Sequence, residues 1–470
     1  MPASERFDTV IIGAGMSGLA AGIRLAQFDQ RVLVTDRHYL WGGLNSFYKL
    51  GGRRFDVGLH ALTNYMPPGA PGAKRRPLAR VLRQLRLSHA DLQLGEQNYS
   101  AIAFPGVRLR FKNGFGLLQE DVFARFPRDA DGFRRLVRDL ADYPVLDGDA
   151  PRVSARERLA EYLTEALLID MLLLPVCYYG SPTPGDIEWT SFVILFKSLY
   201  EEGFARPEGG VRTILDLLRH RYAELGGELR MRCGVERVLH SGGVARGVRL
   251  EDGTEVAAER VISSAGYVET MRLCGATIAA SAVRPGDLGD LSFVESISVL
   301  DTKPAELGHD ATITFFNSED RLVYAKPEAP VDYRSGVICC PDNYACRAPA
   351  QEGLFRLTLL ANYDAWTAFP EERYRAEKEE LWRTGHGAIT DFAPDIRPHT
   401  VFKDIFTPRT IEKFTGHLNG AVYGSPNKRT SGETELRGLY ICGTDQGYLG
   451  IVGAMLSGVS IANRHALMTA

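Results

Sequence analysis

Apolar residues recur with two different periods along the chain, and the changes of period divide it into segments. Short β-branched runs at 7–12 and 31–36 predict buried strands, and four further strands are predicted between 228 and 263. Helical spacing dominates between 155 and 200, the most apolar part of the chain, and alternating segments between 296 and 360 predict antiparallel strands. The pattern therefore predicts an α/β fold, α+β overall, in which a doubly wound sheet is interrupted by two long insertions.

The first predicted strand runs directly into three glycines that precede a predicted helix. Gly13 makes the tight turn, Gly15 lets a pyrophosphate approach the backbone, and Gly18 lets the helix pack closely on the strand. The helix N-terminus at Met16 and Ser17 presents unpaired N–H groups and the positive end of the helix dipole to anionic phosphates. This stretch predicts a dinucleotide-binding unit.

A carboxylate and a second glycine turn follow in the places where such a unit uses them. Asp36 ends the second predicted strand, near the spacing of about 20 residues expected for the group that accepts hydrogen bonds from the adenosine ribose. The pair Gly42 and Gly43 offers a further close approach of backbone to cofactor, and nicotinamide-binding units do not need it. Arg37 and Ser46 complete this set of candidate cofactor contacts.

The order of these motifs resembles a flavoprotein family. Gly-x-Gly-x-x-Gly, the acid, Gly-Gly-x-x-Ser and then Phe-Asp-x-Gly at 55–58 are similar to the amine oxidase-like superfamily of amine oxidases, phytoene desaturases, carotenoid isomerases and retinol saturases. Leu59 and His60 stand where desaturases usually have proline and a small hydroxyl residue, and look more like the Gly-x-His of retinol saturases. The resemblance implies FAD as the cofactor.

Two later segments carry the rest of the resemblance. It implies that Val235 contacts the adenine through its backbone and that Ala265 ends a strand beside the cofactor. Near the C-terminal end, an apolar strand leads to a glycine turn and a glycine-rich helix start, similar again to retinol saturases and some carotenoid isomerases. There the resemblance implies that the Asp445 carboxylate bonds the ribitol chain. The other candidate cofactor residues in this segment are Gly443, Gly450, Ile451, Val452 and Ala454.

The FAD-binding domain is therefore expected to be built from three separated segments. These are residues 1–70, 205–290 and 405–470, and the two insertions, 71–204 and 291–404, are expected to form a substrate-binding domain with an antiparallel sheet and apolar helices. A core and the wall of an apolar tunnel have the same composition, so both readings of those helices stay open.

The expected chemistry is that of the flavin, which exchanges hydride at N5, while the protein holds an apolar substrate and excludes water. We expect a long isoprenoid or polyene, acted on by desaturation, saturation or cis–trans isomerisation. His60, His417 and Tyr423 are candidate groups near the flavin, and a structural hydrogen-bonding role is the alternative for each. No cluster with metal-ligand spacing occurs in the sequence, so no metal is expected.

Two alternatives stay open. An amine or amino-acid oxidase of the same superfamily would need an aromatic cage or a carboxylate-binding arginine at the flavin, and the sequence shows neither. A non-enzymatic isoprenoid carrier similar to Rab escort proteins would carry degraded flavin motifs, whereas Gly13, Gly15, Gly18, Asp36 and Asp445 are all intact.

Composition limits the partners. The 470 residues have a net charge of −3, which argues against nucleic-acid binding, and seven cysteines without a Cys-x-x-Cys pair indicate reduced thiols in the cytoplasm. Residues 74–86 hold six basic residues and no acidic one, with apolar residues on one helix face. This pattern is typical of an interfacial membrane anchor on the inner face of a membrane, and a surface helix packed on its own domain is the alternative. The oligomeric state is left open.

Overall fold

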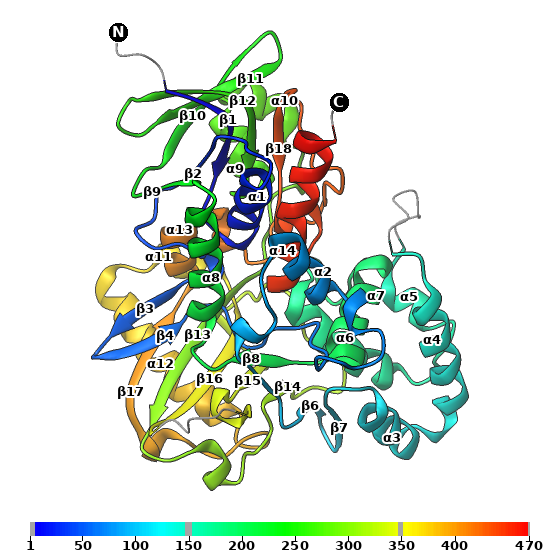
Figure 1. Ribbon diagram of the computed structural model, residues 1–470. Helices are drawn as coiled ribbons and strands as arrows, with labels where there is room; N and C mark the ends of the chain where they lie inside the picture. The colour runs from blue at the N-terminus through cyan, green and yellow to red at the C-terminus, as the bar shows by residue number, and fades with distance from the viewer. Residues whose placement is uncertain (1–4, 146–152, 346–350, 469–470) are drawn as a thin grey trace.

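Two seven-stranded sheets and a helical lobe make up the protein (Figure 1). The computed structural model describes residues 5–145, 153–345 and 351–468. In Figure 1 the first sheet lies at the top, close to both chain ends, the second lies below it, and the helices of the lobe lie to the right. The predicted α/β class is confirmed.

The first sheet takes its strands from three stretches of chain that are far apart in sequence. Its order is β10-β11-β12-β1-β2-β9, with β18 paired to β12. The neighbouring strands β12, β1, β2 and β9 are parallel to one another, and β18 is parallel to β12. Strand β11 pairs antiparallel with both β10 and β12. Their bounds are β1 (Glu5–Ile12), β2 (Val32–Asp36), β9 (Glu228–Met231), β10 (Val235–Ser241), β11 (Val244–Leu250), β12 (Glu255–Ser263) and β18 (Leu439–Ile441).

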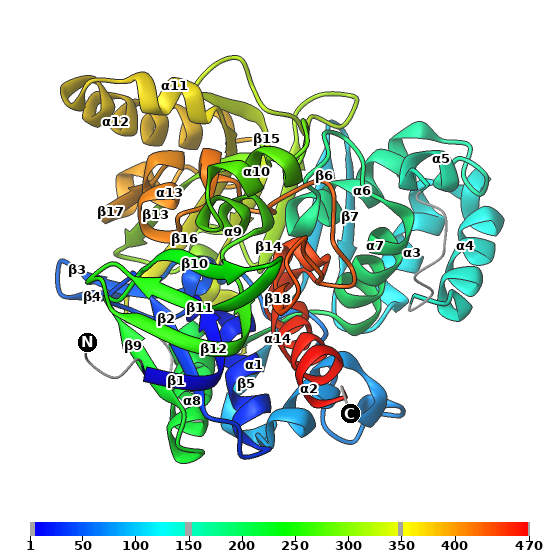
Figure 2. The ribbon, with the colours of Figure 1, turned by 90° about the horizontal axis from the view of Figure 1, so that it is seen from above.

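Both faces of this sheet are covered, because successive side chains of its central strands point to opposite sides. Ile11 packs in one core with α1 and α14, whereas its neighbours Val10 and Ile12 pack in another with β10, β11 and α9. Figure 2 shows α1 and α14 side by side on one side of the sheet. The helices of this part are α1 (Met16–Ala26), α2 (Pro77–Leu85), α8 (Val211–Glu224), α9 (Tyr267–Leu273), α10 (Ala276–Ala282) and α14 (Gly450–Ala462).

The second sheet is the antiparallel sheet that the sequence predicts. Its order is β17-β13-β16-β15-β14-β6-β7, and only the pair β14–β6 is parallel. One face packs on α12 and the other on α6. The bounds are β6 (Ser100–Phe104), β7 (Val107–Phe111), β13 (Ser292–Leu300), β14 (Ile313–Asn317), β15 (Val331–Cys339), β16 (Gly353–Ala361), β17 (Thr400–Phe406), α11 (Tyr363–Ala368), α12 (Glu371–Ala388) and α13 (Pro408–Thr415).

The helical lobe differs from the sequence prediction at one place. The apolar stretch 155–177 forms two helices rather than one, and in the segment between them the backbone N–H groups of Thr164 and Glu165 donate to the buried Asp129 carboxylate. The lobe contains α3 (Gly116–Arg125), α4 (Ala130–Asp142), α5 (Ala155–Leu159), α6 (Ala166–Gly180) and α7 (Trp189–Phe196).

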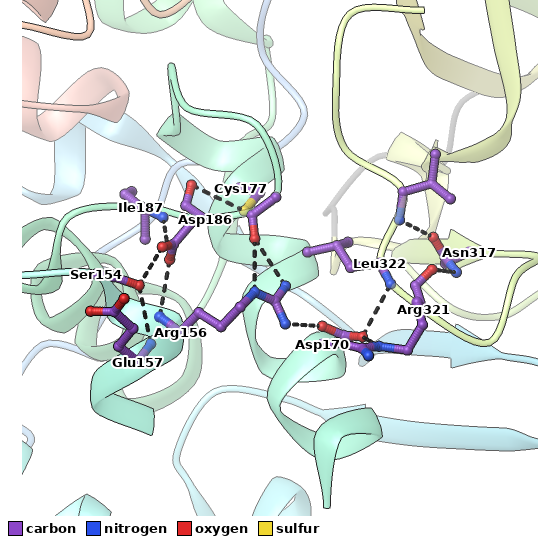
Figure 3. A network of polar contacts seen from close by, with 12 residues as sticks. Ser154, Arg156, Glu157, Asp170, Cys177, Asp186, Ile187, Asn317, Arg321 and Leu322 are labelled. Carbon is purple, nitrogen blue, oxygen red and sulfur yellow. Dashed lines mark hydrogen bonds and ion pairs between the residues drawn. The ribbon is translucent and has the colours of Figure 1, made fainter. Parts of the chain in front are cut away.

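A buried carboxylate joins this lobe to the second sheet (Figure 3). Asp170 of α6 is fully enclosed and pairs with Arg156 of α5 and with Arg321 of the segment after β14. The Leu322 backbone N–H also donates to it, at 3.2 Å. A second carboxylate in Figure 3, Asp186, accepts from the Arg156 backbone N–H.

Two short antiparallel strand pairs lie outside the two large sheets. The hairpin of β3 (Phe47–Leu50) and β4 (Arg53–Asp56) lies in the segment assigned to the FAD domain, yet its Phe55 packs on the second sheet. Strands β5 (Leu94–Glu96) and β8 (Ala205–Pro207) pair antiparallel. The domain boundaries given above stay a prediction.

Helix α2 corrects the expectation of a membrane anchor. Its apolar residues, Leu78, Val81, Leu82 and Leu85, are all buried in the core that α1 and α14 share. They are used inside the protein and are not available to a bilayer, so the alternative of a helix packed on its own domain describes the structure. Within the described part of the chain, no helix is long and apolar enough to cross a membrane.

Candidate active site

Two adjoining cavities lie near the ends of the first sheet's strands β1 and β2, and the larger of them is also lined by residues of the second sheet. The smaller has a volume of about 350 Å³ and the larger about 560 Å³. Seven residues belong to the walls of both, namely Asp36, Gly43, Leu44, Asn45, Thr415, Thr444 and Ala454. A ligand bound in one cavity would therefore lie directly beside the other cavity.

The glycine turn forms the wall of the smaller cavity as the sequence predicts. Gly13, Gly15, Met16 and Ser17 line it at the N-terminus of α1. A Cβ placed on Gly15 would meet no atom within 4 Å, so the space in front of this helix end is open for a ligand. Gly18 does not line the cavity; a Cβ there would lie 2.0 Å from the Gly13 carbonyl oxygen, which is the close packing expected of it.

Asp36 is held at the junction of the two cavities by the backbone. One carboxylate oxygen accepts from the Ala14 N–H at 2.8 Å and the other from the His38 N–H at 2.8 Å. Each oxygen keeps a lone pair for a further donor, as ribose recognition requires. Arg37, Val235 and Ala265 also line the smaller cavity.

The Gly42–Gly43 pair brings a second stretch of backbone to the same place. Both glycines have positive φ, +115° and +58°, and the Gly42 N–H donates to the Ala14 carbonyl at 2.9 Å. A Cβ on Gly43 would lie 3.6 Å from the Gly15 Cα, so the two glycine turns are in contact. Ser46 lines the larger cavity and donates through Oγ to the Trp41 carbonyl.

The C-terminal segment supplies the opposite wall. Gly443 lines the smaller cavity, and Gly450, Ile451 and Ala454, in the first turns of α14, line the larger one. Val452 differs from the expectation because its side chain is buried in the core with α1.

Asp445 also lies elsewhere than expected. Its carboxylate is buried and accepts hydrogen bonds from the backbone N–H groups of Tyr267, at 2.7 Å, and Ser425, at 2.8 Å. It lines neither cavity, and the preceding residue, Thr444, lines both. The carboxylate therefore holds the turn through these two backbone groups, and its bond to the ribitol chain stays a prediction.

The three candidate catalytic residues do not lie together. His60 and Tyr423 line the larger cavity, whereas His417 lines the smaller one, so it belongs with the dinucleotide-binding residues. Burial would lower the pKa of His417, but Glu269, 3.8 Å away, raises it above the usual value for histidine. Burial raises the pKa of Tyr423, whose hydroxyl donates to the Tyr178 carbonyl.

A polar cluster beside His60 escaped the sequence analysis. Glu295 of β13 and Thr358 of β16 line the larger cavity, and Arg356, which is 1% exposed, pairs with Glu295 behind it. The sequence signal is a single charged residue inside an apolar strand, at Glu295 and again at Arg356. Such residues are almost never buried without a partner, and only the tertiary structure, which places Arg356 diagonally across from Glu295 on neighbouring strands, shows that these two form an ion pair.

Apolar side chains reach solvent at the opening of the larger cavity. Tyr39, Leu50 and Phe414 line it and are 43–48% exposed.

Comparison with known proteins agrees with this geometry. A family profile described as an NAD(P)-binding Rossmann-like domain matches residues 11–73. Prolycopene isomerase 1 of an Oncidium hybrid is 23% identical, covering 98% of this chain and 84% of that protein. The all-trans-retinol 13,14-reductase of Danio rerio is 24% identical, covering 98% and 87%. The chain is therefore similar to carotenoid isomerases and a retinol reductase over nearly its whole length.

Solved structures show the same fold at low sequence identity. An oxidoreductase from Methanosarcina mazei has a TM-score of 0.67 at 18% identity and covers 96% of this chain and 99% of its own. A triple mutant of putrescine oxidase has a TM-score of 0.65 at 17% identity, with 98% of each chain covered.

Proposed function

We propose that this protein binds FAD and is an oxidoreductase of long apolar isoprenoids or polyenes. The observation that carries the proposal is the shared wall between the cavity lined by the glycine turn and a larger, mainly apolar cavity that reaches the second sheet. Ligand sites of this kind are mainly apolar with a few converging polar groups, and the larger cavity has both. Relatives named for work on prolycopene, phytoene and all-trans-retinol support the substrate class.

The residues present fit an FAD molecule. Gly13, Gly15 and the N-terminus of α1 would hold the pyrophosphate, and Asp36 the adenosine ribose. The start of α14 at Gly450 would face the flavin, and Thr444 lies between the two cavities. When bound, the flavin supplies hydride exchange.

The remaining wall residues hold and shield the substrate. Phe293, Tyr178, Tyr179 and Val337 surround the larger cavity with aromatic and aliphatic surface. A ligand that buries this surface gains about 25 cal/mol per Å² of apolar area and displaces water from the reacting atoms.

The alternatives have less support. An amine oxidase would benefit from a free carboxylate to attract a cation, but Glu295, the carboxylate beside His60 in the larger cavity, is already paired with Arg356. A carrier without catalysis would not need an open space in front of Gly15, which this chain keeps.

An anaerobic titration tests the proposal. The purified protein is expected to show flavin absorption, and polyenes derived from geranylgeranyl and squalene are added to its oxidised and dithionite-reduced forms. Bleaching of oxidised flavin with a red-shifted product indicates a desaturase, reoxidation with loss of a double bond a saturase, and altered geometry without net flavin turnover an isomerase. A colourless protein, or a flavin that no polyene perturbs, would overturn the proposal.

A further inference from the structure

The polar cluster of the larger cavity is built around one imidazole. His60 follows β4, Glu295 lies on β13, and Arg356 and Thr358 lie on β16. Burying a charged pair beside an apolar cavity is costly unless every hydrogen-bonding group is satisfied. The hydrogen bonds of the cluster hold the His60 side chain in one orientation.

Arg356 holds both the carboxylate and the loop that carries the histidine. Its Nε donates to Glu295, its Nη1 to the Leu59 carbonyl at 2.8 Å, and its Nη2 to the Val57 carbonyl. Arg206 adds a second bond to the Leu59 carbonyl, at 2.6 Å. The backbone up to His60 is thereby fixed by two arginines.

Only one edge of the imidazole is used by the protein. Nε2 of His60 lies 3.6 Å from Glu295 Oε1 and 3.3 Å from Thr358 Oγ1. Among the described residues, none forms a hydrogen bond with Nδ1, and the His60 side chain, 17% exposed, lines the larger cavity. With its proton on Nε2, donated to Thr358 Oγ1 and facing the Glu295 carboxylate, a neutral imidazole leaves a lone pair on Nδ1.

We propose that Arg356 and Glu295 are positioning residues that hold His60 with Nδ1 as the proton-exchanging atom of the larger cavity. The inference rests on the proposed function, since it assigns the proton to this chain and the hydride to a flavin. In desaturation, a C–H bond facing Nδ1 breaks, its electron pair becomes the second bond of the alkene, and Nδ1 takes the proton, while the neighbouring carbon loses a hydride to oxidised flavin. Saturation reverses each of these transfers.

Glu295 also stabilises the charge that this exchange creates. An imidazolium at His60 would face the Glu295 carboxylate, as in other carboxylate–histidine pairs. Burial lowers the pKa of His60 and Glu295 opposes that shift, whereas Arg356 and Arg206 add to it. Burial would raise the pKa of Glu295, but Arg356 and His60 lower it, so the carboxylate is ionised. The backbone oxygen of His60 is occupied by the Tyr344 hydroxyl, at 3.1 Å.

Nuclear magnetic resonance of ¹³Cε1-labelled histidine tests the positioning without any substrate. Glu295→Gln is expected to lower the pKa of His60 by about 1 unit or more, a tenfold change in proton affinity, because the opposing negative charge is lost. Glu295→Asp keeps the negative charge, so the pKa of His60 in this variant should lie close to its value in the wild-type protein. His386→Gln, which removes a buried imidazole outside the cavity, should leave the His60 signal unchanged.

Activity on the polyene identified above gives the second readout. His60→Ala is expected to lower kcat by about 10²-fold or more and Glu295→Gln by about tenfold, with flavin content and KM unchanged. An unshifted pKa in both Glu295 variants, or full kcat in His60→Ala, would overturn the inference. If the wild-type protein turns over no polyene, the resonance titration still decides the positioning, so that this failure belongs to the proposed function.

Discussion

At the scale of single residues, the two glycines of the first turn have separable roles. A Cβ on Gly15 points into open space at φ −74°, which alanine adopts freely, whereas a Cβ on Gly18 lies 2.0 Å from a backbone oxygen. Gly15→Ala should therefore keep the thermal stability of the flavin-free protein but lower flavin affinity at least tenfold, because the methyl group occupies the phosphate space. Gly18→Ala is the matched control, and it should lower both the thermal stability and the flavin affinity, because its methyl group clashes with the backbone. Differential scanning fluorimetry and flavin absorbance measure the two quantities, and a Gly15 variant with full flavin content would contradict this assignment.

At the scale of elements, Asp170 is the joint between the helical lobe and the second sheet (Figure 3). Asp170→Asn keeps the shape of the side chain but removes the charge that Arg156 and Arg321 share. We expect a loss of about 2–3 kcal/mol in the free energy of unfolding, since hydrogen bonds to charged groups contribute about 1.5–3 kcal/mol and part of the arginine charge reaches solvent. Urea unfolding measures this loss. The exposed pair Asp131–Arg134 provides the control, and Asp131→Asn should change stability by less than about 0.5 kcal/mol. Equal losses in the free energy of unfolding for the two variants would contradict the prediction that the Asp170 network holds the helical lobe on the second sheet.

At the scale of the whole molecule, two buried histidines set the acid limit of stability. Burial lowers the pKa of His386 to about 3 and that of His309 to about 4, below the usual 6.5. The unfolded chain takes up these protons as pH falls below about 6.5, while the folded chain excludes them, so unfolding becomes easier toward pH 4 by about 1.4 kcal/mol per pH unit for each histidine. His386→Gln removes one of the two protons taken up on unfolding, so it should reduce this slope by about 1.4 kcal/mol per pH unit. The same change at His220, which is exposed, should leave the slope unchanged. Unfolding free energies between pH 7 and 4.5 measure the slope, and an unchanged slope in the His386 variant would contradict the prediction.

Local chemistry explains why the sequence predicts which glycines and carboxylate line the smaller cavity. The turn at Gly13 and Gly15, the strand end at Asp36 and the glycine pair at 42–43 act within one βαβ unit, where spacing along the chain fixes spacing in space. The strands between 228 and 263 are likewise found as predicted, because their alternation reflects burial on the two faces of one sheet.

The sequence alone thus determined the Rossmann-like unit, the α/β class and the resemblance to carotenoid isomerases, phytoene desaturases and retinol saturases. Only the tertiary structure decided which residues share a cavity: it moved His417 to the smaller cavity, turned Asp445 behind the wall, buried the apolar face of α2, and joined His60 to Glu295 and Arg356. The physical reason is distance along the chain. Residues 60, 295 and 356 meet through the pairing of β13 with β16 and the contact of both with the segment after β4, and no periodicity encodes such long-range contacts.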